Sequence, residues 1–512
     1  MEASVKQERP PYGLLSVLMV AAFIAFLNNT LLNIALPSIM TDLEVGPSTV
    51  QWLTTGFMLV NGILIPTTAF LIQKYSVRKL YIAAMGLFLL GTLLAGFAHE
   101  FSLLLAGRMT QASGSAILMP LLMNVMLVSF PVEKRGAAMG VFGLVLMGAP
   151  AIGPTLSGYL VEHYDWRMLF HFVTPIAAVV LLLGIFLIKD KKDKVNITLD
   201  YFSVLLSSIG FGGLLYGFSS AGSKGWDSPL VYGTIIAGVI GLTWFILRQI
   251  NQEKPMLNFK IFKYPMYALS ISISMVVTMA MFSGMLLLPI YVQQIRGISP
   301  LDAGLMLLPG AILMAIMSPI NGKLFDKYGG RILAITGLTI TVVTSYLFSQ
   351  LSMDTSYTEL IILYTVRMFG MSMVMMPVST NGLNQLPAMY YPHGTAMNNT
   401  LQQVSGAIGT ALLVTVMSNR AESRGIELGE EAMKNAAASG VQPTAEQVAQ
   451  MKAQIGMQAM LDGINFAFFV SVFIAALALV MAFFIKRAKQ EEDIISKKPD
   501  GGTVMPKLAG NN

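Results

Sequence analysis

The sequence predicts an all-α membrane protein with fourteen transmembrane helices, arranged as two six-helix halves plus two inserted helices. Apolar runs of about 20 residues, each long enough to cross a bilayer, recur along the 512 residues. Only 12% of the residues are charged, against about 25% in a soluble domain. Two motifs also occur twice in the same order, which indicates a duplicated unit.

The apolar runs divide the chain into segments. We expect spans near residues 13–36, 52–72, 79–98, 102–128, 136–161, 168–188, 201–221, 229–248, 266–292, 301–321, 331–350, 357–382, 395–418 and 463–485. The first run lacks the pattern of a cleaved signal peptide, so we expect it to be retained as a span. The resulting segments are a cytoplasmic N-terminus (1–12), an N-terminal half (13–188), a linker with two inserted helices (189–265), a C-terminal half (266–486) containing an external loop (419–462), and a cytoplasmic tail (487–512). In the external loop we expect an amphipathic helix, with a solvated connector as the alternative.

The basic residues orient these spans. Most of the 33 Lys and Arg residues lie in segments on the side of the N-terminus, and those on the other side are concentrated in the 419–462 loop. Because cytoplasmic loops carry an excess of Lys and Arg, both termini of this multi-pass cell-membrane protein are predicted to be cytoplasmic. The excess of Lys and Arg in the cytoplasmic segments also accounts for the net charge of +6. This charge is therefore no reason to expect nucleic acid as a partner.

The composition argues against several classes of site. The chain has no Cys, and its four His residues lack metal-ligand spacing, so we expect neither disulfides nor a metal site. We find no nucleophile–base set and no phosphate-binding Gly-rich Lys motif. The sequence therefore predicts a protein that is not an enzyme and needs no cofactor.

One repeated motif surrounds an arginine within a span. Arg108 is followed by Gln111 in the fourth span, and Arg367 occupies the matching place in the twelfth. A charge within a span costs at least about 2.5–3.5 kcal/mol on insertion scales, so both arginines should face the protein interior or water. The alternative to a functional role is that each arginine binds helix carbonyls and fixes packing.

The other repeated motif is the loop that follows spans 2 and 10. Its second copy contains Gly322, Asp326, Lys327, Gly329, Gly330 and Arg331. The paired glycines permit a tight turn, and Asp326 can pair with basic groups or cap a helix N-terminus. The loop is thus a candidate clasp for one conformational state, with a solvated turn as the alternative. The first copy has Gln73 in place of Asp326, which argues against a charge-based clasp there.

The fifth span carries a series of small residues around a Gly-Pro pair. The series consists of Gly140, Ala149, Gly153, Pro154, Ser157 and Gly158. Small residues let helix backbones approach closely, and a proline removes one helical hydrogen bond. An ordinary packing face is the alternative to a special role in conformational change.

Taken together, these motifs resemble the major facilitator superfamily over nearly the whole chain. Within it the sequence is similar to the fourteen-span drug:proton antiporters, and most of all to the lincomycin-resistance type of exporter from Gram-positive bacteria. The fifth-span series resembles the antiporter motif, and the resemblance implies a part for Arg108 in proton coupling. The sequence departs from the family at Asn28, where the first span usually has an acid.

Proton coupling usually needs a titratable group within the membrane, and here it is hard to find. None of the 27 Asp and Glu residues lies in the middle of a span. Asp302 and Asp462 lie at span ends and are therefore the candidate proton carriers, with Arg108, Gln111 and Arg367 as further coupling candidates. The alternative is that both acids only stabilise helix N-termini.

The spans contain amide and thioether side chains but no carboxylate in their middle. The candidates for a substrate cavity are Asn28, Asn33, Asn61, Asn124, Asn398, Asn399, Gln402, Met371 and Met375. Amides in membrane helices either join helices or line cavities, and flexible Met side chains suit varied ligands or ordinary packing. Such a cavity favours neutral or weakly basic amphiphiles.

These inferences predict a secondary active exporter of amphipathic small molecules or antibiotics, of the multidrug or lincosamide type. Proton antiport with alternating access between the two halves would drive it. The alternative is an exporter or flippase of an endogenous lipid or signalling metabolite. Its expected partners are its substrates, protons and the lipid bilayer, and we expect a monomer.

Overall fold

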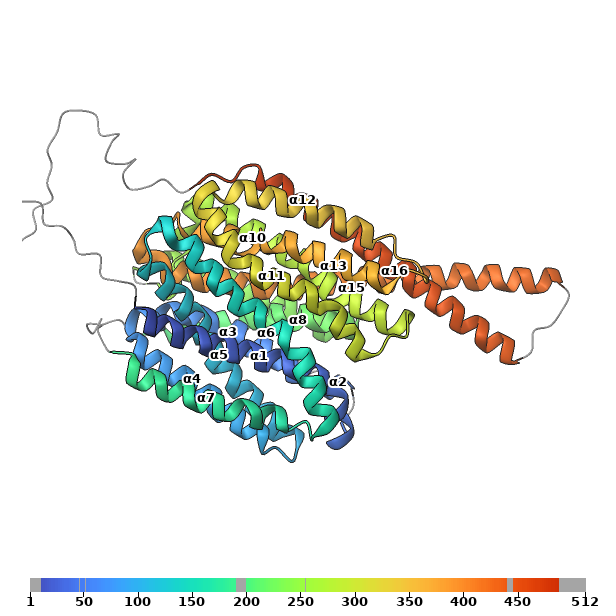
Figure 1. Cartoon of the computed structure of the whole chain (residues 1–512), viewed down its shortest axis with the longest axis horizontal. Helices are drawn as coiled ribbons and strands as arrows, with labels where there is room; N and C mark the ends of the chain where they lie inside the picture. The colour runs from blue at the N-terminus through green and yellow to red at the C-terminus, as the bar shows by residue number, and fades with distance from the viewer. Residues whose placement is uncertain are drawn as a thin grey trace, which may run out of the picture.

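The computed structural model describes residues 11–45, 47–50, 52–189, 199–253, 255–439 and 445–487, and every regular element in these ranges is a helix (Figure 1). The first half consists of α1 (Tyr12–Asp42), the short α2 (Pro47–Val50), α3 (Trp52–Lys74), α4 (Val77–Gly96), α5 (Phe101–Ser129), η1 (Val132–Lys134), α6 (Arg135–His163) and α7 (Met168–Leu187). The inserted pair is α8 (Tyr201–Lys224) and α9 (Pro229–Asn251), followed by η2 (Phe259–Lys263). The second half consists of α10 (Pro265–Ile290), η3 (Tyr291–Ile295), α11 (Pro300–Tyr328), α12 (Gly330–Phe348), α13 (Tyr357–Ser372), α14 (Met375–Leu383), η4 (Ala388–Tyr390), α15 (Tyr391–Ser439) and α16 (Ala445–Ala482).

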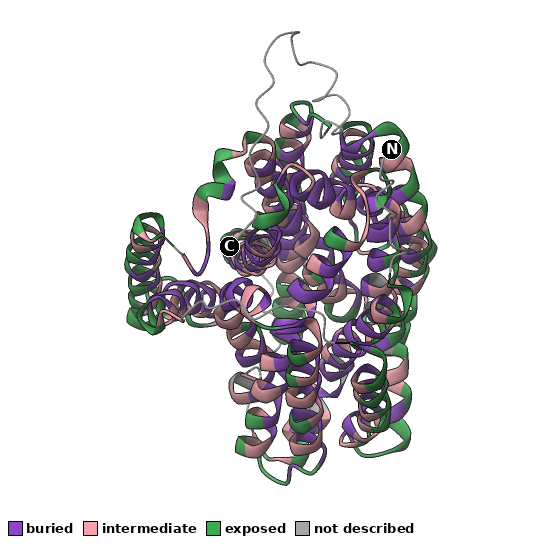
Figure 2. Cartoon of the chain, turned by 90° about the vertical axis from the view of Figure 1, so that its left-hand side faces the viewer, coloured by how far each residue is buried: buried purple, intermediate pink, exposed green. Residues whose placement is uncertain are grey.

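The helices account for the fourteen predicted spans. Thirteen segments of the described chain are long and apolar enough to cross a membrane, and α13 and α14 together form one of them. The remaining crossing is α6, a helix of 29 residues in which several side chains fall outside the described residues. Bulky apolar side chains such as Phe186 on α7 and Ile240 on α9 are exposed on the outside of the bundle, while the helices bury the faces that they turn toward one another (Figure 2). This pattern is that of a bundle surrounded by lipid.

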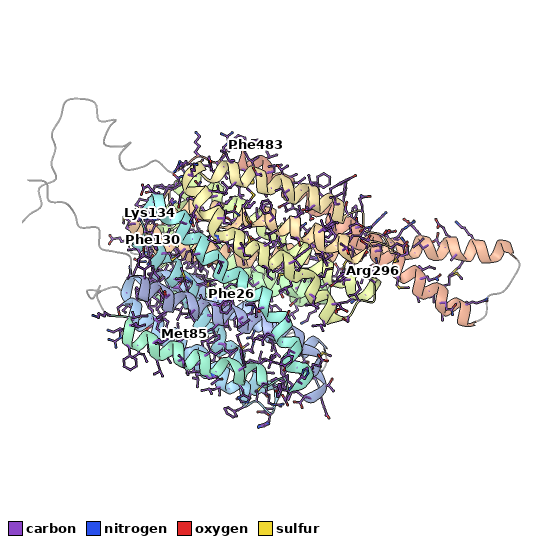
Figure 3. All side chains as sticks on the ribbon, viewed as in Figure 1. Phe26, Met85, Phe130, Lys134, Arg296 and Phe483 are labelled. Carbon is purple, nitrogen blue, oxygen red and sulfur yellow. The ribbon has the colours of Figure 1, made fainter. Side chains whose placement is uncertain are left out.

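The bundle has two distinct ends. We call the end at which α1 begins and α16 ends the terminus face; Phe130 and Lys134 lie there (Figure 3). The opposite end, toward which Arg296 lies, is the hairpin face, because the distal parts of α15 and α16 project beyond the bundle there (Figures 1 and 3).

The segment 419–462, for which we expect an external loop with an amphipathic helix, is helical over a greater length than expected. Within the described residues α15 continues to Ser439 and α16 already begins at Ala445. The segment is rich in Ala, Glu, Gln, Lys and Met, which are strong helix formers, so both helices extend past the membrane. Near the bundle the two helices are joined by Arg424, whose Nε lies 3.0 Å from Oδ2 of Asp462.

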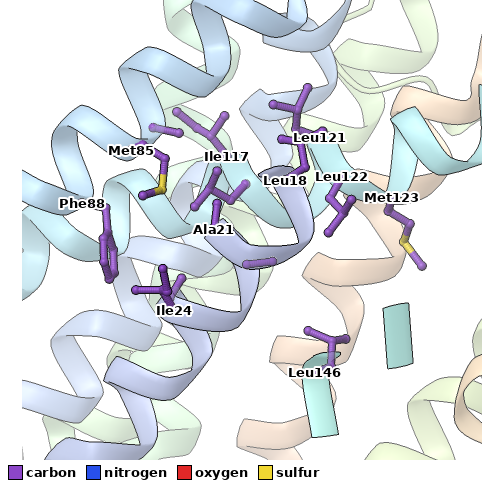
Figure 4. Packing of buried hydrophobic residues seen from close by; sticks show 14 of the residues in the cluster. Leu18, Ala21, Ile24, Met85, Phe88, Ile117, Leu121, Leu122, Met123 and Leu146 are labelled. Atoms are coloured by element: carbon purple, nitrogen blue, oxygen red, sulfur yellow. The ribbon is translucent and has the colours of Figure 1, made fainter. Parts of the chain in front are cut away.

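The core of each half is built by close helix packing. Leu18, Ala21 and Ile24 of α1 share one buried apolar cluster with Phe88 of α4 and Ile117 of α5 (Figure 4). Fully buried alanines on α1 let the neighbouring helices approach closely. The two halves meet mainly along α6 and α11, which run side by side (Figure 1).

The inserted helix α8 packs on α3 of the first half and on α15 of the second, while α9 packs on α8. A polar cluster holds the inserted pair together at the terminus face. Asp200 caps α8 by accepting a hydrogen bond from the Ser203 amide, and its Oδ2 lies 2.9 Å from Nε of Arg248 on α9. Burial alone would raise the pKa of Asp200, but hydrogen bonds from Arg248, Ser203 and Gln252 together hold it well below its ordinary value. The pair is therefore a fixed part of the bundle rather than a loose linker.

Candidate functional site

Arg108 is fully buried in the first half, as its position within a span requires. Its guanidinium donates to Oε1 of Gln111 at 3.0 Å and to Oδ1 of Asn29 at 3.1 Å. It also lies over the Phe57 ring, 4.4 Å from the ring centroid. Among the described residues no carboxylate pairs with it, so amide oxygens and a ring hold the charge.

The Arg108 network connects four helices. Gln111, on the same helix α5, donates to Oγ1 of Thr92 on α4 at 2.9 Å, while Asn29 belongs to α1 and Phe57 to α3. Asn29 was missed by the sequence prediction, which selected its neighbour Asn28. Asn28 is buried as well, but its Nδ2 has no hydrogen-bond partner in the described part of the chain.

Arg367 is equally buried but is held differently. Its guanidinium donates to Oγ of Ser345 at 2.6 Å on α12, and to the Ala280 carbonyl and Oγ of Ser283 on α10, each at 2.7 Å. These contacts tie α13 to two neighbours through a carbonyl and hydroxyls. They favour the packing alternative for Arg367.

Asp326 lies at the terminus-face end of α11 and caps a helix of the other half. Its Oδ1 accepts from the Gly136 amide and its Oδ2 from the Ala137 amide, each at 2.8 Å, at the first turn of α6. A carboxylate is stabilised at this position by unpaired amides and the helix dipole. Of the two roles predicted for Asp326, capping is therefore the one observed.

The rest of the predicted loop positions this cap. Gly329 has φ of +82°, which favours glycine and turns the chain from α11 into α12. Lys327 lies over the Tyr328 ring and Arg331 is exposed, so neither pairs with Asp326. Arg487, after α16, instead donates to the carbonyls of Asp326 and Lys327. We call the contact between Asp326 and the start of α6 the acid clasp.

Small residues allow α6 to approach its neighbours. A Cβ on Gly140 would lie 2.6 Å from the Ser318 carbonyl of α11, and one on Gly322 would meet the backbone of α6. A Cβ on Gly153 would lie 2.8 Å from Cβ of Thr30 on α1. At Gly158 the nearest atom would be 3.8 Å away, an ordinary contact. The requirement for small residues thus holds at Gly140, Gly153 and Gly322 but not at Gly158, and the side chain of Pro154 lies outside the described residues.

A cavity of about 250 Å³ lies where the two halves and the inserted pair meet. Its walls come from α3, α8, α10 and α15, and they are mostly apolar with hydroxyl and amide groups but no charge. The lining residues are Thr54, Thr55, Met58, Leu59, Leu215, Tyr216, Ser219, Phe282, Met285, Leu286, Gln403, Gly406, Ala407 and Thr410. Met58 and Met285 are exposed at its rim, toward the hairpin-face ends of α3 and α10.

The residues predicted for a substrate cavity lie elsewhere. Asn398 donates to Oγ of Ser379 at 3.1 Å, Asn399 donates to the Thr395 carbonyl at 2.9 Å, and Met371 is buried in an apolar cluster of the second half. Gln402 and Met375 line a much smaller space beside α10. Asn61 is buried on α3 and Oδ1 of Asn124 is buried without a partner among the described groups, while the side chain of Asn33 lies outside the described residues.

The helix face of α15 that lines the cavity is one residue away from the predicted face. Gln403, Gly406, Ala407 and Thr410 follow the i, i+3, i+4, i+7 spacing of a single helix face. The spacing of small residues after Gln403 was the available signal. The prediction instead followed the amides Asn398 and Gln402.

The two candidate acids both have local partners. Asp302 is exposed in the first turn of α11; its amide donates to Oγ of the N-cap residue Ser299 at 3.1 Å, and its Oδ2 accepts from that hydroxyl at 2.7 Å. Asp462 was expected at a helix start, but α16 begins at Ala445 and Asp462 lies well inside it, paired with Arg424. Neither acid lines the cavity.

Comparisons with known proteins agree with this architecture. The sequence profile of the Major Facilitator Superfamily matches residues 18–410. The uncharacterized MFS-type transporter YhcA of Bacillus subtilis is 52% identical over 81% of this chain and 78% of its own length. The lincomycin resistance protein LmrB of the same organism is 43% identical over 95% of this chain and 98% of its own. The crystal structure of the human organic anion transporter MFSD10 has the same fold, with a TM-score of 0.63 at 13% identity, covering 93% of this chain and all of that one.

Proposed function

This chain belongs to the Major Facilitator Superfamily and is a membrane transporter rather than an enzyme, and from that premise we propose that it exports amphipathic small molecules by proton antiport. The terminus face is then cytoplasmic, as the distribution of Lys and Arg indicates. The two halves alternate between access to the cytoplasm and access to the outside.

The cavity between α3, α8, α10 and α15 is the observation that carries this proposal. It lies at the join of the two halves, where a substrate site can be exposed to either side by their relative motion. Its apolar walls suit amphiphiles, and its hydroxyl and amide groups can orient them. Because no charged side chain lines it, neutral and weakly basic compounds suit it better than permanent ions. The name of LmrB, a lincomycin resistance protein, supports a substrate of this kind.

The contacts at the two ends of the bundle support alternating access. The acid clasp and the close glycine contacts join α6 and α11 at the terminus face. The rim of the cavity at Met58 and Met285 is exposed toward the hairpin face. This arrangement supports a cycle that includes a state closed toward the cytoplasm.

Filling the cavity tests its role. The replacement Ala407→Phe adds a ring to the cavity wall, so we expect export of bulky amphiphiles to fall at least about tenfold, as it would for a loss of about 1.4 kcal/mol of binding free energy. Efflux from cells and substrate binding to the purified protein are the measurements. Leu412→Phe, at an exposed position of the same helix, is the matched control and should transport normally. Normal binding and efflux by Ala407→Phe would show that this cavity is not the substrate site.

A further inference from the structure

His393 lies at a contact between the two halves that matches the acid clasp in position. Gln73, at the end of α3, occupies the place in the first repeated loop that Asp326 occupies in the second. Its Nε2 lies 3.1 Å from Nε2 of His393, in the first turn of α15. The acid clasp likewise joins such a loop to the first turn of a helix in the other half. The duplicated fold therefore places a second contact at the terminus face, with a Gln and a His in place of a carboxylate and bare amides.

The hydrogen bonds around His393 require a neutral imidazole. Asn258, in the segment after α9, directs its backbone N–H at Nδ1 of the ring at 3.2 Å, and Gln73 directs its side-chain amide at Nε2. A neutral imidazole accepts through one nitrogen only, and the backbone N–H of Asn258, which can only donate, makes that nitrogen Nδ1. An imidazolium donates through both nitrogens and accepts from neither. Protonation therefore breaks the bond to Asn258 whichever way the amide is turned.

The surroundings of His393 oppose a positive charge as well. The ring is 5% exposed, and the groups in contact with it, Gln73, Asn258 and Tyr390, are uncharged. The charged side chains on the segments packed around it are mostly cations: Lys74 over the rings of Phe70 and Tyr75, Lys260 and Lys263 in η2, and Arg135 of α6 over the Tyr391 ring. The one acid in the segment that contains Asn258, Glu253, is exposed. No carboxylate among the described residues pairs with His393. A proton on this ring is thus unfavourable while the contact is closed and becomes acceptable once it opens to water.

We propose that His393 is a proton-coupling residue: its neutral form holds α3 and α15 together at the terminus face, and its protonation releases them. The proposal rests on the proposed antiport function. It supplies a titratable group at the junction of the halves, a property that neither Asp302 nor Asp462 has. No pattern in the sequence singles out this histidine, because its partners are distant in the chain.

The accessibility of a buried position near His393 tests the proposal without any transport assay. Thr395 is fully buried in α15, and the chain has no Cys, so Thr395→Cys introduces the only thiol. Because labelling needs the thiolate, the rate is divided at each pH by that of an exposed control thiol. In protein held in lipid nanodiscs we expect this relative labelling rate to rise several-fold as the pH falls from about 8 to about 5, the range in which histidine changes charge. Adding His393→Gln should abolish this dependence on pH. His163→Gln, at an exposed histidine near the hairpin face, is the matched control and should preserve it.

Further outcomes separate the two proposals. If His393→Gln does not fold, Gln73→Leu serves instead: it removes one partner of the ring, so labelling should be fast at every pH. Unchanged labelling in Gln73→Leu, or an unchanged pH dependence in His393→Gln, overturns the role of His393. A wild-type protein that moves no amphiphile under a pH gradient while its labelling follows pH refutes the antiport function and leaves the pH-sensitive contact in place.

Discussion

At the scale of single residues, Arg108 and Arg367 occupy matching positions in the two halves but are held by different groups. Arg108 binds the side chains of Gln111 and Asn29 and lies over Phe57, whereas Arg367 binds a helix carbonyl and two serine hydroxyls. Side-chain amides can move with a changing helix arrangement, while a helix carbonyl is fixed. The first half therefore carries the more adaptable of the two buried charges.

This difference predicts different outcomes for the two arginines. Arg108→Gln should fold, because a neutral amide replaces a buried cation, and should lose transport that depends on a pH gradient. Arg367→Gln leaves Ser345 and Ser283 without their partner, which costs about 1–3 kcal/mol for a buried group, so its main effect should be a lower unfolding temperature. Thermal unfolding and gradient-driven efflux, measured on both variants, check this. Equal losses in both assays would show that the two residues have one common role.

The burial and the general role of single residues could be predicted from the sequence. Which residues they contact depends on how each helix is rotated and packed. The burial of Arg108 followed from the cost of a charge in a span, and a capping role for Asp326 followed from its place beside a turn. Which helix Asp326 caps depends on how the halves meet. The choice between Gln402 and Gln403 depends on the rotation of α15 about its axis, which tertiary packing sets.

At the scale of elements, α6 and α11 form the main contact between the halves, and small residues determine how closely they approach. The prediction of a close-packed fifth span is confirmed at Gly140 and Gly153. The extent of α15 and α16 could not be predicted by hydropathy, because the segment beyond the membrane is polar. Its helix-forming composition was the better guide, since propensity operates outside the membrane as well.

The positions along α6 should therefore differ in their tolerance of large side chains. Gly140→Leu would drive a side chain into the Ser318 carbonyl and the Pro319 backbone, so we expect it to prevent closure of the terminus face and to abolish export. Gly158→Leu meets only an ordinary contact and should keep most of the transport rate. Efflux normalised to the amount of protein in the membrane is the measurement. Full activity in Gly140→Leu would show that the contact between α6 and α11 is not needed for the transport cycle.

At the scale of the whole molecule, two contacts close the terminus face around the duplicated fold. On one side the acid clasp joins α11 to α6, and on the other Gln73 meets His393 between α3 and α15. The cavity lies between α3, α8, α10 and α15, with its exposed rim toward the hairpin face. The inserted helix α8 forms one wall, so the fourteen-helix architecture contributes to the cavity directly. In the proposed export cycle both terminus-face contacts must open.

A proton gradient is proposed to drive the export of amphiphiles through this fold. The most direct measurement uses purified protein in liposomes, oriented by the accessibility of a single introduced thiol, with an imposed pH gradient and a panel of neutral and weakly basic amphiphiles that includes a lincosamide. We expect these compounds to accumulate against their own gradient on the side that supplies protons, and we expect an ionophore that collapses the pH gradient to stop the accumulation. Accumulation that is unaffected by the ionophore, or transport that only equalises concentrations under the full gradient, would contradict this proposal.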